Sequence, residues 1–169
     1  MVLTKAELLA ALQSEVRILL HLADKIDPSM LEYRPTPKQR STLELLRYLS
    51  IMGPTFVEYG ITGSQDPEIW NRAAAAADAR DFAQTITAIA AQHDGYARLL
   101  GDVPDDVFRR ERSGISGVTS TGASLVNVVL CGCAAYRTQL FLYLKACGRE
   151  DLGTMNLWAG VDAPAPAVS

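Results

Sequence analysis

Four stretches of the chain repeat apolar residues at intervals of three and four positions, the spacing that places side chains on one face of an α-helix. The strongest repeat covers residues 121–148, between a capping Ser120 or Thr121 and a terminal Gly148. At about 1.5 Å per residue, this helix would be roughly 40 Å long and would span a small domain. Its predicted apolar stripe comprises Leu125, Val129, Gly132, Tyr136, Leu140, Tyr143 and Cys147.

Three further helices are predicted over residues 4–26, from residue 41 onward and over residues 81–100. The first two begin with capping boxes, in which Thr4 pairs with Glu7 and Ser41 pairs with Glu44. Each of these helices also has a predicted apolar stripe, called its seam below. The seams are Leu9, Leu12, Val16, Leu19, Ala23 and Ile26 in the first helix, Leu45, Leu49, Met52 and Phe56 in the second, and Phe82, Ile86, Ile89, His93, Tyr96 and Leu100 in the third. Pro54 follows Gly53 inside the second seam and is expected to kink that helix or to end its regular part.

The connections between the helices indicate an all-α four-helix bundle. Residues 60–80 are too many for a tight hairpin, so the second and third helices can run parallel with a long crossover between them. An alanine run inside this crossover is compatible with a short helical turn. Residues 102–119 are expected to form a loop, with a short helix at 103–109 as one alternative. Residues 1–160 would form one domain, and residues 161–169 a flexible tail.

Composition narrows the class of protein. A chain of 169 residues with 49% hydrophobic and 21% charged residues fits one globular domain. A net charge of −3 argues against a general affinity for nucleic acid. The amphipathic N-terminus predicts neither a signal peptide nor a membrane span, and three cysteines without secreted-type spacing favour reduced thiols, so a cytoplasmic location is expected.

Few side chains suggest chemistry. His93 lies on the predicted apolar stripe and is either a hydrogen-bonded core residue or a ligand-site residue. His21 lies off the first seam and is expected on the surface. Arg137 is a polar residue in an apolar run, and it is also expected on the helix surface, with a site role as the alternative. Cys131 and Cys133 are about 200° apart around a helix, so they cannot share one ion and are expected to be inert packing residues.

Three strings resemble the DinB-like family of small bacterial helical-bundle proteins. They are RPTPKQRSTLELLRYLS at residues 34–50, AAYRTQLFLYLKACG at 134–148 and NLWAGVD at 156–162. The resemblance implies an up-down-down-up four-helix bundle that is often dimeric. Many members hold a divalent metal with three histidines, and some metal-bearing relatives act as thiol-dependent transferases or isomerases.

The resemblance places the family's metal-ligand positions at Tyr48, Gly132 and Tyr136. None of the three is a histidine, so the family's metal catalysis does not carry over to these residues. We therefore expect no cofactor, with a divalent metal such as zinc or nickel as the alternative.

The sequence leaves open whether the protein is an enzyme. The first hypothesis is a non-enzymatic homodimer or small-molecule-binding domain without nucleic-acid or membrane partners. The alternative is a transferase or isomerase with a site rebuilt from His93, Tyr48, Tyr136 and Glu44. The candidate pocket residues are Tyr48, Glu44, His93, Gly132, Tyr136 and Arg137. The dimer is expected near the first and fourth helices, because Leu8, Leu20 and Leu22 lie outside the first seam.

Overall fold

The computed structural model describes residues 3–64, 66–114 and 117–163. Its α-helices are α1 (Lys5–Ala23), α2 (Thr42–Thr62), α3 (Pro67–Asp78), α4 (Phe82–Ala90), α5 (Gln92–Leu100), α6 (Thr121–Ser124), α7 (Cys131–Ala146) and α8 (Thr154–Ala159). The remaining elements are the 3-10 turns η1 (Pro28–Met30) and η2 (Val107–Arg109), the π-helical segment η3 (Leu125–Leu130), and the strands β1 (Glu111–Gly114) and β2 (Gly117–Ser120). The all-α prediction is confirmed, because β1 and β2 pair only with each other within the described ranges.

The predicted helix starts are confirmed at α1 and α2. Thr4 and Glu7 form the capping box of α1, and Ser41 and Glu44 form that of α2. Helix α1 ends earlier than predicted, at Ala23, and buries seven residues: Leu8, Leu12, Val16, Ile18, Leu19, Leu22 and Ala23. Leu8 therefore replaces the predicted Leu9 in the core, and it lies with Leu22 inside the bundle.

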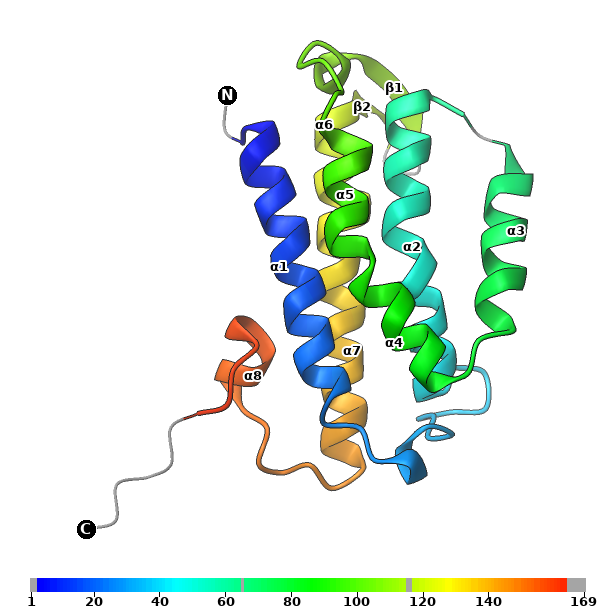
Figure 1. Cartoon of the computed structure of the whole chain (residues 1–169), viewed down its shortest axis with the longest axis vertical. Coiled ribbons are helices and arrows are strands. Elements are labelled where there is room, and N and C mark those ends of the chain that lie inside the picture. The colour runs from blue at the N-terminus through cyan, green and yellow to red at the C-terminus, as the bar shows by residue number, and fades with distance from the viewer. Residues whose placement is uncertain (1–2, 65, 115–116, 164–169) are drawn as a thin grey trace.

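Contacts along α1 show how it runs relative to its neighbours (Figure 1). Near its start, the Lys5 ammonium bonds the Gly101 carbonyl at the end of α5, and further along, Gln13 bonds the His93 carbonyl at the start of α5. These two helices are therefore antiparallel. Further along still, Glu15 pairs with Arg137 of α7.

Helix α2 runs parallel to α5. The Gln92 amide donates to the Leu49 carbonyl over 2.8 Å, and one turn further on Gly53 faces Tyr96. Pro54 stays inside α2, which continues to Thr62. Because α1 is antiparallel to α5, it is also antiparallel to α2.

The third predicted helix is divided into α4 and α5, and its buried stripe differs from the prediction. The residues that face the core are Thr85, Ile89, Gln92, Tyr96 and Leu100. The placement of His93 on this stripe is wrong, because its ring is exposed and bonds Asp94 over 3.0 Å. Two polar residues take inward positions because their hydrogen bonds are satisfied locally. Thr85 donates to Asp81, and Gln92 donates to α2.

The crossover after α2 contains a complete helix, α3, where only a short helical turn was expected. Asp66 caps α3 by accepting from the Glu68 amide, and Pro67 occupies its first turn. Figure 1 shows α3 beside α2 and on its outer side, apart from α1 and α7. Its alanines therefore lie largely outside the core, and only Ala77 is buried.

The long fourth helix is continuous from Thr121 to Ala146, through α6, η3 and α7. By length and composition alone it could cross a membrane, a test that core helices of soluble bundles also pass. Here 22% of the apolar window is buried, and the residues of the helix that lie in the bundle core include Leu125, Val129, Leu140 and Leu144. Gly148 ends the helix region with a φ of 97°, as the glycine signal predicted.

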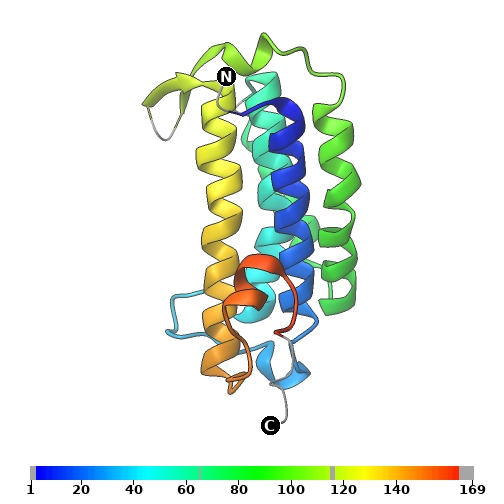
Figure 2. The same cartoon turned by 90° about the vertical axis from the view of Figure 1, so that its left-hand side faces the viewer.

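The C-terminal segment folds back across the bundle (Figure 2). Helix α8 is anchored by Leu152 and Asn156, which are 2% and 3% exposed, whereas the Trp158 side chain is 70% exposed. His21, expected on the surface, is half-buried and bonds Asn156. Within the predicted tail of residues 161–169, Asp162 forms an ion pair with Lys25, and residues 164–169 lie outside the described residues.

Candidate functional site

The two tyrosines at the matched family positions meet between α2 and α7. The ring centroids of Tyr48 and Tyr136 lie 4.9 Å apart in an edge-to-face arrangement. One turn along each helix, Gly132 faces Met52, and a Cβ on Gly132 would lie 3.4 Å from the Met52 Cε atom. The three positions therefore follow one α2–α7 seam.

Their chemistry does not fit the family metal. Two phenols and a glycine provide no imidazole or carboxylate ligand, and phenols are protonated near neutral pH. Burial, followed by a hydrogen bond with Tyr136, raises the pKa of Tyr48 above its ordinary value, which strengthens this conclusion. No group of three His, Cys, Asp or Glu side chains suitable for a metal comes together in the described part of the chain.

Aromatic side chains fill the surroundings of this seam. Trp70 of α3 packs against Tyr48 at 5.8 Å and stacks on Phe56 at 5.5 Å, while the Arg40 guanidinium lies 4.1 Å from the Tyr48 ring centroid. The cluster buries aromatic surface and holds Arg40 by a cation–π contact. Tyr48 is a hydrogen-bonding group here and, with its raised pKa, is unsuited to act as a base. Sequence periodicity missed Trp70 because α3 was not predicted as a complete helix.

Two other candidate residues, Glu44 and His93, have their own surroundings. The Glu44 carboxylate bonds the Ser41 amide and pairs with Arg34 at 3.4 Å, so it serves the start of α2, and its pKa is lowered by these contacts. His93 lines a shallow groove of about 490 Å³ beside α1. Of the set proposed for a rebuilt enzyme site, His93 therefore lies on the α1 side of α5, apart from the Tyr48–Tyr136 contact between α2 and α7.

Arg137 is a buried structural residue. Its side chain is 7% exposed and pairs with Glu15 at 2.7 Å, and it also donates to the Leu157 carbonyl in α8. The surface reading of Arg137 is therefore wrong, because its charge is satisfied inside the contact between α1, α7 and α8. Neighbouring positions on α7 thus face different partners, with Tyr136 toward α2 and Arg137 toward α1.

A separate cleft of about 780 Å³ opens at the end of the bundle where α1 and α6 begin. This is the end of the bundle at which the β1–β2 pair and the N-terminus lie in Figure 2. Its apolar lining comes from three regions, the start of α1, the η2 turn, and α6 with η3. The apolar lining residues are Leu3, Leu8, Phe108, Ala123, Val126 and Leu130.

The wall of this cleft contains the π-helical segment. Val126, Asn127 and Leu130 all belong to η3, where the backbone departs from the regular α-helical repeat. Such segments are rare and occur frequently at functional sites, because they change which side chains face a cavity. No sequence signal marked η3, since its apolar residues also fit an ordinary helix.

Polar groups of the cleft lie mainly at its rim. Asp105, Arg109 and Asn127 are exposed, while Lys5 is half-buried with its ammonium 2.8 Å from the Gly101 oxygen and 3.0 Å from the Val103 oxygen. An apolar interior with a few polar groups at its edge is typical of sites for small molecules.

Comparisons with known proteins agree on the fold. A DinB-like protein from Bacillus subtilis superposes with a TM-score of 0.66 and 16% identity, over 86% of this chain and 94% of that chain. A putative DinB-family member from Exiguobacterium sibiricum gives a TM-score of 0.68 and 21% identity, over 90% and 99%. No protein-family model and no curated protein matches the chain. The resemblance noted in the sequence is confirmed as a shared fold, and at these identities it carries no activity with it.

Proposed function

We propose that this chain with the DinB-like fold is a cytoplasmic, non-enzymatic binding protein that holds a small, largely apolar molecule in the cleft beside η3. The observation that carries the proposal is the 780 Å³ apolar cleft walled by the π-helical segment. Its volume falls within the range of roughly 300–1,000 Å³ that is usual for ligand pockets. The described residues around it include no buried acid–base pair, which favours binding over catalysis.

A neutral fluorescent dye tests this proposal. Nile red should bind the native protein saturably at one site per chain, with a rise in fluorescence on entering an apolar environment. Ala123→Trp should remove this binding, because the indole would fill a cleft whose wall includes Ala123. Ala135→Trp is the matched control, since Ala135 is exposed on α7 and does not line the cleft. Equal binding by both variants, or no saturable binding by the native protein, would reject the proposal.

We also infer a homodimer, on support that differs from that given by the sequence. Leu8 and Leu22 are core residues and no longer argue for an exposed apolar face on α1. Apolar side chains are instead exposed on α7 and α8, including Leu142 at 58% and Trp158 at 70%. Light scattering across a wide concentration range should give twice the chain mass. Trp158→Glu should shift the protein toward monomer, and a constant monomer mass for the native chain would contradict the dimer.

A further inference from the structure

The charged groups at the rim of the cleft bear on the chemistry of its ligand. Lys5 and Arg109 contribute two positive charges to the lining, and Asp105 contributes one negative charge. The Lys5 ammonium is held by two carbonyl oxygens, which leaves one of its three N–H groups to donate elsewhere. The rim therefore carries an excess of positive charge beside an apolar interior.

Arg109 differs from the arginine next to it. Within the described ranges, the Arg109 guanidinium has neither a hydrogen bond nor an ion pair, although it lines the cleft. Arg110 is paired with Asp106 at 2.8 Å and does not line the cleft. A guanidinium presents planar paired donors that match the two oxygens of a carboxylate. Arg109 thus has its donors available at the mouth of an apolar cavity.

Building on the proposed function, we propose that the ligand is a small organic acid with a hydrocarbon body, whose carboxylate lies between Lys5 and Arg109. The hydrocarbon part occupies the interior against Leu8, Phe108, Val126 and Leu130, where its burial supplies most of the affinity. The carboxylate supplies selectivity, because it pairs with cations that a neutral analogue leaves unpaired. The site takes the free acid and not a membrane surface, because its apolar residues line a cavity.

The test compares three ten-carbon probes that differ in their headgroup: decanoate, decan-1-ol and decylamine. Each is measured at pH 7.5 and low salt by displacement of Nile red from the native protein, below its critical micelle concentration. Decanoate should bind about tenfold more tightly than decan-1-ol, and decylamine more weakly than both. Raising the salt concentration should reduce the preference for decanoate, because the rim is exposed to solvent.

Matched variants separate this inference from the proposed function. Arg109→Ala should remove most of the preference for decanoate while leaving the affinity for decan-1-ol unchanged, and Arg110→Ala should retain the preference. If decan-1-ol binds at the cleft as tightly as decanoate, or if decylamine is preferred, the carboxylate inference is overturned while the proposed function stands. If the native protein does not bind Nile red saturably, the proposed function fails as well; if the dye binds and none of the three probes displaces it, the carboxylate inference is overturned. Sedimentation with phosphatidylcholine–phosphatidylglycerol vesicles, together with no binding of decanoate, would assign the cleft to a membrane surface and overturn the inference.

Discussion

Gly53 of α2 faces the Tyr96 side chain of α5, and its lack of a side chain leaves room for the Tyr96 hydroxyl. A Cβ at this position would lie 1.9 Å from the Tyr96 hydroxyl oxygen. Tyr96 is 1% exposed and its hydroxyl bonds Gln92, so it has little room to move. Gly53→Ala should therefore lower the free energy of unfolding by about 2–3 kcal/mol, measured by urea denaturation.

Gly95→Ala is the control for this substitution. Its Cβ would meet only the Arg98 guanidinium, at 3.9 Å, so the change should be neutral or stabilising by up to about 1 kcal/mol through helix propensity. Adding Tyr96→Phe to Gly53→Ala should recover part of the loss, because the clashing oxygen is removed. A Gly53→Ala variant as stable as the native protein would show that α2 and α5 are further apart.

The cysteines differ in accessibility. Cys131 is exposed, so the reading of both helix cysteines as inert packing residues is corrected for this thiol. Burial raises the pKa of Cys133 to about 12. At pH 8, a thiol reagent should label Cys131 rapidly and reach Cys133 only after unfolding. The fast phase should disappear in Cys131→Ala and persist in Cys133→Ala, and rapid labelling of Cys133 in the native protein would contradict its placement.

The Cys133 pKa also predicts a direction for stability at high pH. Its value in the folded protein lies above the ordinary value of 9.0, so the protonated thiol is favoured by folding. The corresponding stability should be fully present below about pH 9 and should decline as pH rises toward 12. Urea midpoints should therefore fall less steeply over this interval in Cys133→Ala than in the native protein. Parallel pH profiles would contradict the assignment.

Single residues also show what sequence reasoning could and could not find. Apolar spacing placed Ile89, Tyr96 and Leu100 correctly in the core. It put His93 inside because hydrophobic spacing does not show that Gln92 can bond the Leu49 carbonyl. Tyr48 and Tyr136 were placed from the resemblance, and the structure brings their rings together.

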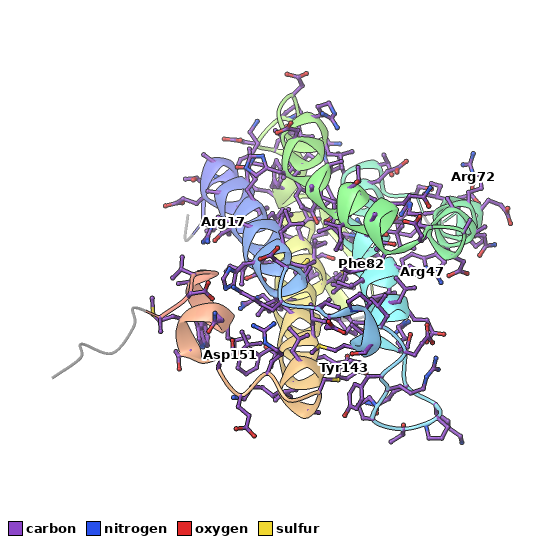
Figure 3. All side chains as sticks on the ribbon, turned by 60° about the horizontal axis from the view of Figure 1, so that its bottom comes forward. Arg17, Arg47, Arg72, Phe82, Tyr143 and Asp151 are labelled. Atoms are coloured by element: carbon purple, nitrogen blue, oxygen red, sulfur yellow. The ribbon has the colours of Figure 1, made fainter. Side chains whose placement is uncertain are left out.

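At the scale of the element, α8 depends on cations from two other helices. Arg137 joins Glu15 of α1 to the Leu157 carbonyl of α8, and Arg17, labelled in Figure 3, donates to the Ala159 carbonyl. Arg137→Met should cost about 3–5 kcal/mol, because it leaves the Glu15 carboxylate buried without its partner. Hydrogen exchange of the α8 amides should accelerate in the same variant.

Two comparison variants check the cause. Glu15→Leu added to Arg137→Met should restore most of the stability, because no unpaired charge then remains. Arg17→Met should cost less than about 1 kcal/mol, since Arg17 is exposed and contributes one hydrogen bond to α8. Unchanged exchange of α8 in Arg137→Met would show that other contacts hold this helix.

Elements defined by local chemistry were predictable, and elements defined by tertiary contacts were not. The capping boxes predicted where α1 and α2 begin, and Gly148 predicted where the fourth helix ends, each to within a few residues. The length of α3 was underestimated because its alanine run has no apolar stripe, although Asp66 and Pro67 are good signals for the start of a helix. The π-helical η3 and the β1–β2 hairpin have no strong local signal, since short segments of this kind depend on their surroundings.

At the scale of the whole molecule, the fold and the proposed site are separate features. The α2–α7 seam that carries the family's metal positions is filled here by Tyr48, Tyr136 and Met52. The open cavity lies elsewhere, between the starts of α1 and α6. The fold could be predicted from four helical repeats. The cleft could not, because its lining joins residues from three distant parts of the chain.

Mapping of a bound neutral probe by ¹H–¹⁵N NMR tests the central claim most directly. Titration with decan-1-ol should shift the amide signals of Leu8, Phe108, Ala123, Val126 and Leu130 saturably, because these residues line the cleft. The signals of Tyr48, Tyr136 and Trp70 should stay in place. Saturable shifts confined to those aromatic residues, or no saturable shifts at all, would contradict the account of this cleft as the binding site.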